Sequence, residues 1–155
     1  MTKKQHLEGL LSKTLQVMEK NDNIVWYLKL QIMPLAHKPN PADYIVLSHY
    51  RAILIECKET TSNTFVFSRL TQLNDMLYFS SKGNKFKSYL LMCFWDGKYN
   101  NSLYYYIPIE IFQMEMTKTN KKSFNKNDFE RLFGQYILTY DKEYKILDMR
   151  DLFKY

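Results

Sequence analysis

The chain has 155 residues, 46% of them hydrophobic and 16% aromatic, which is enough to bury the core of one compact domain. Its 22 Lys and Arg outnumber its 16 Asp and Glu, giving a net charge of +6 at pH 7. Such an excess suits a polyanionic partner, although many cytosolic proteins are mildly basic without one. The sequence has no repeats and no boundary between domains, so we predict a single domain over residues 1–155.

Several classes of protein are disfavoured by patterns that the sequence lacks. No apolar run approaches the roughly 18 residues that span a bilayer, and the start has no signal-peptide core, so we expect a cytoplasmic protein without membrane attachment. Cys57 and Cys93 lie in apolar runs without ligand spacing, which is typical of core cysteines in a reducing compartment. The four glycines form no phosphate-binding loop, and the three histidines are scattered without the spacing of metal ligands or of a catalytic triad.

The first half of the chain alternates a helical pattern with strand patterns. Hydrophobic spacing predicts an amphipathic helix over 4–20, then a strand over 24–32 and a proline-containing loop over 34–41. Two short β-rich runs, 43–47 and 52–57, are separated by four polar or bulky residues, which predicts a hairpin. Antiparallel pairing would bring the start of the first run close to the end of the second.

The second half continues with further helices and strands. We predict a helix over 68–79, with Ser68 as N-cap and Leu70, Leu73, Leu77 and Tyr78 on its apolar side. The remaining elements are predicted as a central strand at 88–95, a turn at 96–98, a strand at 102–108, a basic loop at 118–122, a short helix at 127–133 and a terminal turn or helix at 148–153.

Two acids and a lysine in the predicted hairpin form the pattern with most chemical content. Asp43 begins the first strand, while Glu56 and Lys58 end the second, where they share a face roughly 6–7 Å apart and Cys57 points the other way. Asp43 and Glu56 would each give Mg²⁺ a hard oxygen ligand, and the backbone carbonyl of Cys57 could be a third. A cation held there stabilises the charge that develops during phosphodiester cleavage and makes an attacking water more acidic.

The role of the lysine, and the specificity of the pattern, leave alternatives open. Lys58 could orient or deprotonate the attacking water, or contact a non-bridging phosphate oxygen. The pattern Glu-x-Lys also occurs at Glu143 and Lys145, where a charged segment predicts a solvated surface. Glu56 instead follows the apolar run 53–55, where burial normally excludes charge, so a functional site is favoured there over a structural ion pair.

Together with the residues that follow, this pattern resembles the RecU-type Holliday junction resolvases of the PD-(D/E)XK nuclease superfamily. The resemblance rests on Asp43-Tyr44, Leu54-Ile55-Glu56-Cys57-Lys58-Glu59-Thr60, Phe65, Phe67, Gln72 and Met76. The string Glu-x-Lys-Glu-Thr over 56–60 is its most specific part. The stretch 122–148, in which a short helix precedes a final hydrophobic segment, is similar to the end of that family, and the match to the first helix is weaker.

The resemblance implies a restriction-endonuclease-like fold, an α/β fold in which helices flank a mixed central β-sheet. It implies metal binding by Asp43 and Glu56, a catalytic Lys58, a supporting polar role for Gln72 and an outer metal or water contact for Glu8. It also implies Mg²⁺, which Mn²⁺ would replace, and a homodimer, since two strands must be cut symmetrically. The short connection before Asp43, and Ile45-Val46 after it, depart from bacterial members and favour a phage-type or archaeal-type resolvase.

Contacts to DNA are expected from clustered lysines. The candidates for phosphate contacts are Lys82, Lys85, Lys87, Lys118, Lys121 and Lys122. Tyr104-Tyr105-Tyr106 could stack on bases, but aromatics in a strand are more often core. We therefore predict a Mg²⁺-dependent endonuclease for branched DNA, above all four-way junctions. A restriction-type or repair nuclease of the same superfamily and an inactive DNA-binding relative are the alternatives.

Overall fold

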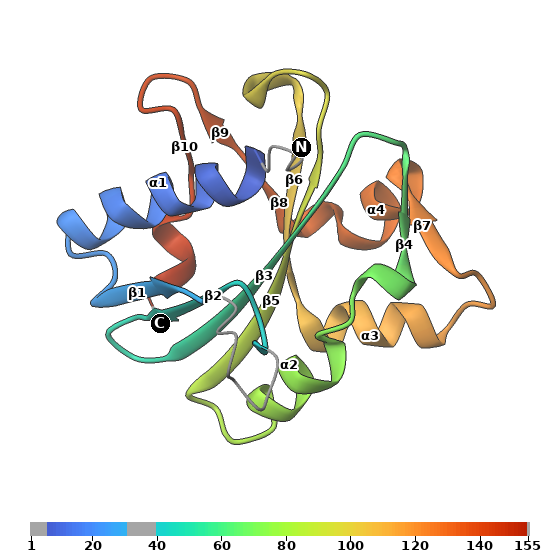
Figure 1. Cartoon of the computed structure of the whole chain (residues 1–155), viewed down its shortest axis with the longest axis horizontal. Helices are drawn as coiled ribbons and strands as arrows, with labels where there is room; N and C mark the ends of the chain where they lie inside the picture. Colours follow the sequence, from blue (N-terminus) through green and yellow to red (C-terminus); the bar gives the residue numbers. More distant parts are fainter. Residues whose placement is uncertain (1–5, 31–39, 155) are drawn as a thin grey trace.

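A computed structural model describes residues 6–30 and 40–154, and its centre is a six-stranded sheet (Figure 1). The strand order is β1-β2-β3-β5-β6-β8. The bounds are β1 Trp26–Lys29, β2 Tyr44–Leu47, β3 Ala52–Thr60, β5 Phe86–Phe94, β6 Leu103–Pro108 and β8 Ile137–Leu138. Among the described strands, only β3 and β5 pair in parallel, from Ala52 opposite Phe86 to Thr60 opposite Phe94, so the sheet is mixed as predicted.

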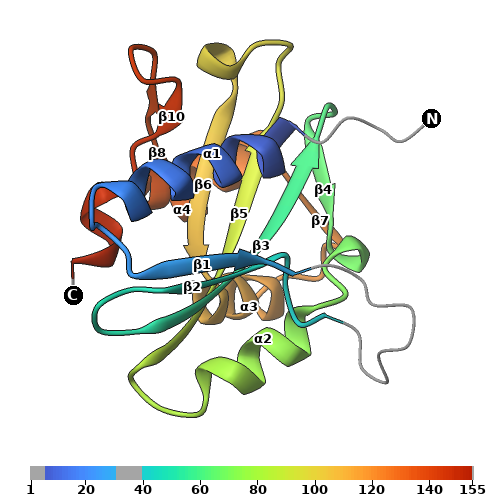
Figure 2. The same ribbon diagram turned by 60° about the vertical axis from the view of Figure 1, so that its left-hand side comes forward.

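Helices cover both faces of this sheet (Figures 1 and 2). Successive side chains of β3 and β5 alternate between the faces, and both faces are apolar because both are covered. Helix α1 (His6–Lys20) packs on the face that carries Ile55, Cys57 and Leu91. The opposite face, with Leu90, Met92 and Phe94, contacts α2 (Leu73–Ser80), α3 (Ile109–Thr117) and α4 (Lys126–Phe133).

The hairpin of β2 and β3 has the predicted turn and register. Ser48 and Arg51 close the turn through the Ser48 amide and the Arg51 carbonyl at 2.9 Å. The predicted strand 24–32 is shorter, since β1 covers only Trp26–Lys29 and residues 31–39, including most of the predicted loop, lie outside the described part. The predicted first helix begins at His6 within the described residues.

The helix predicted over 68–79 begins later, and its cap was wrong. Residues Phe67–Arg69 form a 3₁₀ turn, and α2 begins at Leu73 after Gln72, which makes no side-chain capping bond. The prediction also placed Tyr78 on the apolar side, but Tyr78 is 65% exposed, whereas Met76 is fully buried. The 3₁₀ turn shifts the helix start by several residues and therefore changes which positions face the sheet.

The region after β6 contains a helix that the sequence analysis did not predict. Helix α3 starts directly after Pro108 and buries Ile109 and Phe112. The basic loop 118–122 follows it, and helix α4 matches the prediction to within one residue. The smaller elements are β4 (Thr64–Val66), η2 (Tyr99–Asn101), β7 (Ser123–Asn125), η3 (Gly134–Tyr136), β9 (Tyr140–Asp141), β10 (Ile146–Leu147) and η4 (Arg150–Phe153).

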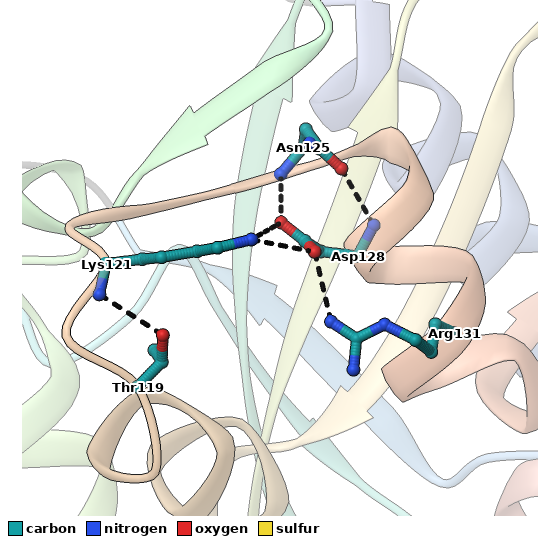
Figure 3. Close-up of polar contacts among 5 residues, drawn as sticks. All are labelled: Thr119, Lys121, Asn125, Asp128 and Arg131. Carbon is teal, nitrogen blue, oxygen red and sulfur yellow. Dashed lines mark hydrogen bonds and ion pairs between the residues drawn. The ribbon is translucent and has the colours of Figure 1, made fainter.

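Helix α4 has a complete capping box at its start, which also ties the basic loop to the domain (Figure 3). The side chain of Asn125 accepts from the Asp128 amide at 2.8 Å, and the Asp128 carboxylate accepts from the Asn125 amide at 3.1 Å. The same carboxylate pairs with Lys121 and Arg131. No helix within residues 6–30 and 40–154 has the length and apolar character needed to span a bilayer.

Candidate active site

The hairpin of β2 and β3 places Asp43 beside the segment of β3 that carries Glu56 and Lys58. The Asp43 amide donates to the Ile55 carbonyl at 3.1 Å, which continues the ladder of the hairpin by one residue. The Cys57 amide donates to Oδ2 of Asp43 at 2.8 Å. Asp43 therefore lies next to Glu56, as the predicted antiparallel pairing requires.

Glu56 and Lys58 lie on one face of β3, and Cys57 lies on the other. The Nζ atom of Lys58 is 3.2 Å from Oε1 of Glu56, whose side chain is only 2% exposed. The Cys57 side chain packs in the core beneath α1. Only the backbone of Cys57 can therefore provide a metal ligand on the face that carries Glu56 and Lys58. The shared face predicted from strand alternation is confirmed.

A cleft of about 250 Å³ opens above these residues. Its walls come from α1, β3, the 3₁₀ turn before α2 and the start of β2. The lining residues are Leu7, Glu8, Asp43, Glu56, Cys57, Lys58, Glu59, Thr61, Arg69 and Gln72. The structure thus brings all the predicted catalytic and metal-binding residues to one cleft.

Burial raises the proton affinity of both Asp43 and Glu56 in the cleft. Burial, followed by the charge of Asp43, raises the pKa of Glu56 from 4.5 to about 7, while Lys58 opposes the shift. Burial also raises the pKa of Asp43, and the amide of Cys57 opposes this shift most strongly. The charge of Asp43 disfavours a second negative charge on Glu56, and a cation bound by both carboxylates would relieve this repulsion.

Two buried oxygen atoms in the cleft suit a hard cation. Oε2 of Glu56 and Oε1 of Gln72 are buried and have no hydrogen-bond partner within the described part of the chain. Orphaned buried oxygens are rare in folded proteins, and Mg²⁺ is bound by such oxygens together with water and phosphate. Within residues 6–30 and 40–154, no three His, Cys, Asp or Glu side chains lie close enough together to hold one metal ion. The donor set therefore fits a Mg²⁺ ion held by one or two carboxylates, not a fully protein-ligated ion.

Glu8 reaches the cleft from the first turn of α1. Its carboxylate pairs with Lys29 on β1, with Oε2 and Nζ 3.0 Å apart. The start of α1 is fixed by Glu59, which accepts from the Leu7 amide at 2.8 Å and contacts Nδ1 of His6 at 3.0 Å. Glu8 therefore lines the cleft, and its assignment as an outer metal or water contact remains a prediction.

Sequence reasoning missed Arg69, which also lines the cleft. Its guanidinium donates to the Glu59 carbonyl at 2.9 Å and lies 5.6 Å from the centre of the Phe65 ring. Arg69 ends the 3₁₀ turn, three residues before Gln72. The predicted continuous helix over 68–79 concealed this placement, since only the observed turn brings Arg69 to the cleft.

The alternative patterns are explained by the structure. Glu143, Tyr144 and Lys145 are exposed in the β9–β10 turn, where Lys145 has a φ of 56°, so the solvated reading of this Glu-x-Lys copy is confirmed. Tyr104, Tyr105 and Tyr106 are all at least 97% buried, and these tyrosines belong to the core.

The six lysines predicted to contact phosphate lie in two regions. Lys82, Lys85 and Lys87 lie in or next to the turn before β5, at the end of the sheet where β3 begins. In the other region, Lys118 pairs with Glu115 at 3.3 Å and Lys121 pairs with Asp128 at 3.2 Å. The amide of Phe67 donates to the carbonyl of Lys122 at 3.0 Å, which joins the basic loop to the 3₁₀ turn that carries Arg69.

Comparison with known proteins gives a structural match. The sequence matches no protein-family model and no curated protein. The structure is similar to that of Hjc from Archaeoglobus fulgidus, a Holliday junction resolvase from an archaeal hyperthermophile, with a TM-score of 0.52 and 12% sequence identity. The match covers 77% of this chain and 89% of the Hjc chain. The protein has the restriction-endonuclease-like fold, as predicted.

At this level of identity the similarity describes the fold and does not distinguish a RecU-type protein from an archaeal one. Further conclusions must come from the cleft itself.

Proposed function

We propose that the protein is a metal-dependent endonuclease that cuts branched DNA, above all four-way junctions. The observation that carries the proposal is the cleft in which Asp43, Glu56 and Lys58 meet beside two orphaned buried oxygens. Buried carboxylate oxygens of structural ion pairs are usually hydrogen-bonded, whereas Oε2 of Glu56 has no partner within the described residues. The fold of a Holliday junction resolvase supports the choice of junctions as substrate.

Asp43 and Glu56 would hold Mg²⁺, with the Cys57 carbonyl as a further ligand and Gln72 nearby. Mn²⁺ should be able to replace Mg²⁺ at this site. Bound there, the ion would neutralise charge on the phosphate and make the attacking water more acidic. Because the pKa of Glu56 is raised to about 7, binding of a cation to its carboxylate near neutral pH would be coupled to proton release.

The chain's own residues would position the scissile phosphate and the water. Lys58 lies next to Glu56 and can donate to a non-bridging phosphate oxygen or orient the attacking water. Attack forms a new bond from the water oxygen to phosphorus and breaks the bond to the leaving oxygen of the sugar. Arg69, which is exposed at the rim, can donate to the neighbouring phosphate.

The proposal is tested by cleavage of a labelled four-way junction beside a linear duplex with the same arm sequences, in Mg²⁺ and in EDTA. We expect nicks at symmetry-related positions on opposed strands of the junction, only with Mg²⁺, and an intact duplex. Lys58→Ala should lower the cleavage rate by about 10²- to 10³-fold. Lys13→Ala, which changes an exposed lysine of α1, is the matched control and should cut at the wild-type rate.

The other outcomes identify the alternatives. Cleavage of linear duplex at a fixed short sequence would indicate a restriction-type nuclease. Binding of the junction without cleavage in Mg²⁺ or in Mn²⁺ would indicate an inactive DNA-binding relative. Wild-type cleavage by Lys58→Ala would exclude this cleft as the active site.

We also propose that the protein acts as a homodimer, because two opposed strands must be cut. The sheet edge formed by β1 supports this proposal, since Val25, Trp26 and Leu28 are 51%, 43% and 45% exposed there.

A further inference from the structure

A second hollow lies beyond the carboxyl ends of β3 and β5, outside the cleft. The β5–β6 loop, the β9–β10 hairpin and the start of α1 meet there (Figures 1 and 2). The lining residues are His6, Trp95, Gly97, Lys98, Tyr99, Asn100, Tyr140, Lys142 and Lys145, around about 530 Å³. We name this hollow the aromatic groove. Its residues come from three distant parts of the sequence, and the catalytic site uses none of them.

The aromatic rings of the groove pack into one continuous patch. His6 stacks on Trp95 with ring centres 3.8 Å apart, and Tyr99 meets Trp95 edge to face at 5.0 Å. Tyr99 also lies nearly parallel to Tyr140 at 5.8 Å. These four rings are half-buried, so part of the patch faces the groove. Patches of this kind bind the faces of unpaired bases in proteins that bind single strands.

The charge of the groove complements a phosphate backbone. Lys98, Lys142 and Lys145 are exposed, and none of them has an ion-pair partner within the described residues. The described lining contains no carboxylate, although Asp96 and Glu143 are exposed next to it in the sequence. Unlike Lys118 and Lys121, which are paired with acids, these three ammonium groups can contact phosphates without losing a partner.

The groove and the catalytic cleft are neighbours along the same strands. The Trp95 amide donates to the Thr60 carbonyl at 2.9 Å, so Trp95 continues the pairing of β5 with β3. Glu56 is opposite Leu90, five residues before Trp95. This spacing is roughly 16 Å along the strand, or about five nucleotides at the 3.4 Å rise of one DNA strand. Glu59, which lines the cleft, contacts His6 of the groove at 3.0 Å.

We infer that the aromatic groove binds an unpaired stretch of the DNA substrate, such as a strand that is open at a branch point. Its bases contact the patch of Trp95, Tyr99 and Tyr140, and its phosphates contact Lys98, Lys142 and Lys145. The inference rests on the proposed function and adds that the substrate is recognised by unpaired bases near the cut. A fully paired duplex would engage the lysines alone.

The test uses intrinsic fluorescence in EDTA, where no cleavage occurs. The chain has two tryptophans, and Trp26→Phe leaves Trp95 as the sole indole. We expect a single-stranded oligo(dT) to quench the fluorescence of Trp95, with less quenching by a blunt duplex of equal length. Absence of quenching while oligo(dT) binds, as followed by fluorescence anisotropy of labelled DNA, would overturn the inference.

Variants separate stacking from charge. Tyr99→Leu with Tyr140→Leu should weaken oligo(dT) binding by about 5- to 150-fold while weakening duplex binding much less. Equal losses for both DNAs would contradict base contact. Tyr144→Leu is the matched control, because Tyr144 lies in the same hairpin, is 61% exposed and is absent from the groove lining. It should bind both DNAs like the wild type.

Lys145→Gly tests the charge without a risk to folding. Lys145 has a φ of 56°, a conformation that glycine adopts easily, so this variant should fold at least as stably as the wild type. Its slope of log K against log salt for oligo(dT) should fall by about 0.7. An unchanged slope would show that Lys145 does not contact the strand and would count against the groove.

The inference and the proposed function fail in different ways. Quenching by oligo(dT) without cleavage of any junction would support the groove and contradict the nuclease. Junction cleavage that is unchanged in Tyr99→Leu with Tyr140→Leu, at DNA concentrations well below saturation, would support the nuclease and contradict the groove. Quenching of Trp95 that depends on protein concentration alone would indicate that a second copy of the chain occupies the groove, which also contradicts the inference.

Discussion

The Cys57 amide donates a hydrogen bond to Oδ2 of Asp43 at 2.8 Å, and this bond ties the residue before β2 to the segment of β3 that carries Glu56 and Lys58. It supplies the main influence that opposes the rise in the pKa of Asp43. The bond therefore keeps a carboxylate in position beside Glu56, in a cleft where burial favours the neutral acid.

Asp43→Asn should stabilise the protein without metal and abolish its response to Mg²⁺. The amide oxygen of Asn can still accept from Cys57, while the charge beside Glu56 is removed. We expect a higher melting temperature in EDTA at pH 8 and no further rise on addition of Mg²⁺. Asp43→Ala leaves the Cys57 amide without its acceptor and should be less stable than Asp43→Asn. A Mg²⁺-induced rise of wild-type size in Asp43→Asn would contradict the assigned metal site.

The second prediction concerns the pH dependence of stability in EDTA. The folded pKa of Glu56, about 7, lies above its ordinary value of 4.5. The stabilisation from neutral Glu56 is therefore complete below pH 4.5 and is lost as the pH rises through 7. Between these limits the wild type should lose up to about 3 kcal/mol of unfolding free energy relative to Glu56→Gln.

Urea unfolding of the wild type and Glu56→Gln between pH 4.5 and 8 measures this difference. Glu19→Gln, at an exposed position of α1, is the control and should follow the wild type at every pH. A constant difference between the wild type and Glu56→Gln across this range would show that Glu56 titrates normally.

The hairpin of β2 and β3 could be predicted from sequence because its signals are local. The continuous apolar run 53–55 predicts a buried strand, and the charged residues Glu56 and Lys58 at its end are costly unless they serve a site. The turn over 48–51 then determines the register, which pairs Tyr44 with Ile55 and brings the preceding Asp43 next to Glu56. Each step depends on neighbours in sequence.

Features that depend on distant contacts could not be predicted in this way. Helix α3 has few buried positions, and its start after Pro108 carries no capping side chain. The true start of α2 depends on a 3₁₀ turn that is held by Lys122, more than 50 residues away. The aromatic groove requires the packing of His6 on Trp95, a contact that no local pattern encodes.

The third prediction concerns the capping box of α4 (Figure 3). Asp128→Ala removes the acceptor of the Asn125 amide and the partner of Lys121 and Arg131. We expect a loss of about 1–2 kcal/mol in unfolding free energy, measured by chemical denaturation. The pKa of Asp128 is lowered chiefly by the Asn125 amide, so its contribution should disappear as the pH falls below 3.8. Equal stability of Asp128→Ala and the wild type at pH 7 would contradict this role.

The fourth prediction distinguishes the lysines of the basic loop. Lys122 is exposed and has no ion-pair partner within the described residues, whereas Lys118 pairs with Glu115. Lys122→Gln should lower the slope of log K against log salt for duplex DNA by about 0.9, the value for one lost phosphate contact. Lys118→Gln should have a smaller effect because part of its charge is already neutralised. If neither slope changes, the DNA surface lies elsewhere, with Lys82, Lys85 and Lys87 as the next candidates.

The last prediction concerns dimerisation through β1. This edge strand pairs only with β2 among the described strands and exposes Trp26 and Leu28. Charged residues on an edge strand oppose association of one sheet edge with another. Leu28→Lys should therefore give a monomer in sedimentation at micromolar concentrations, where we expect the wild type to sediment as a dimer. The control is Ile137→Lys on the opposite edge strand β8, where Ile137 is 50% exposed, and this variant should remain dimeric. A homodimer is proposed because one cleft can cut only one strand at a time. A dimeric Leu28→Lys variant would place the interface elsewhere. A wild type that is monomeric both with and without junction DNA would contradict the homodimer.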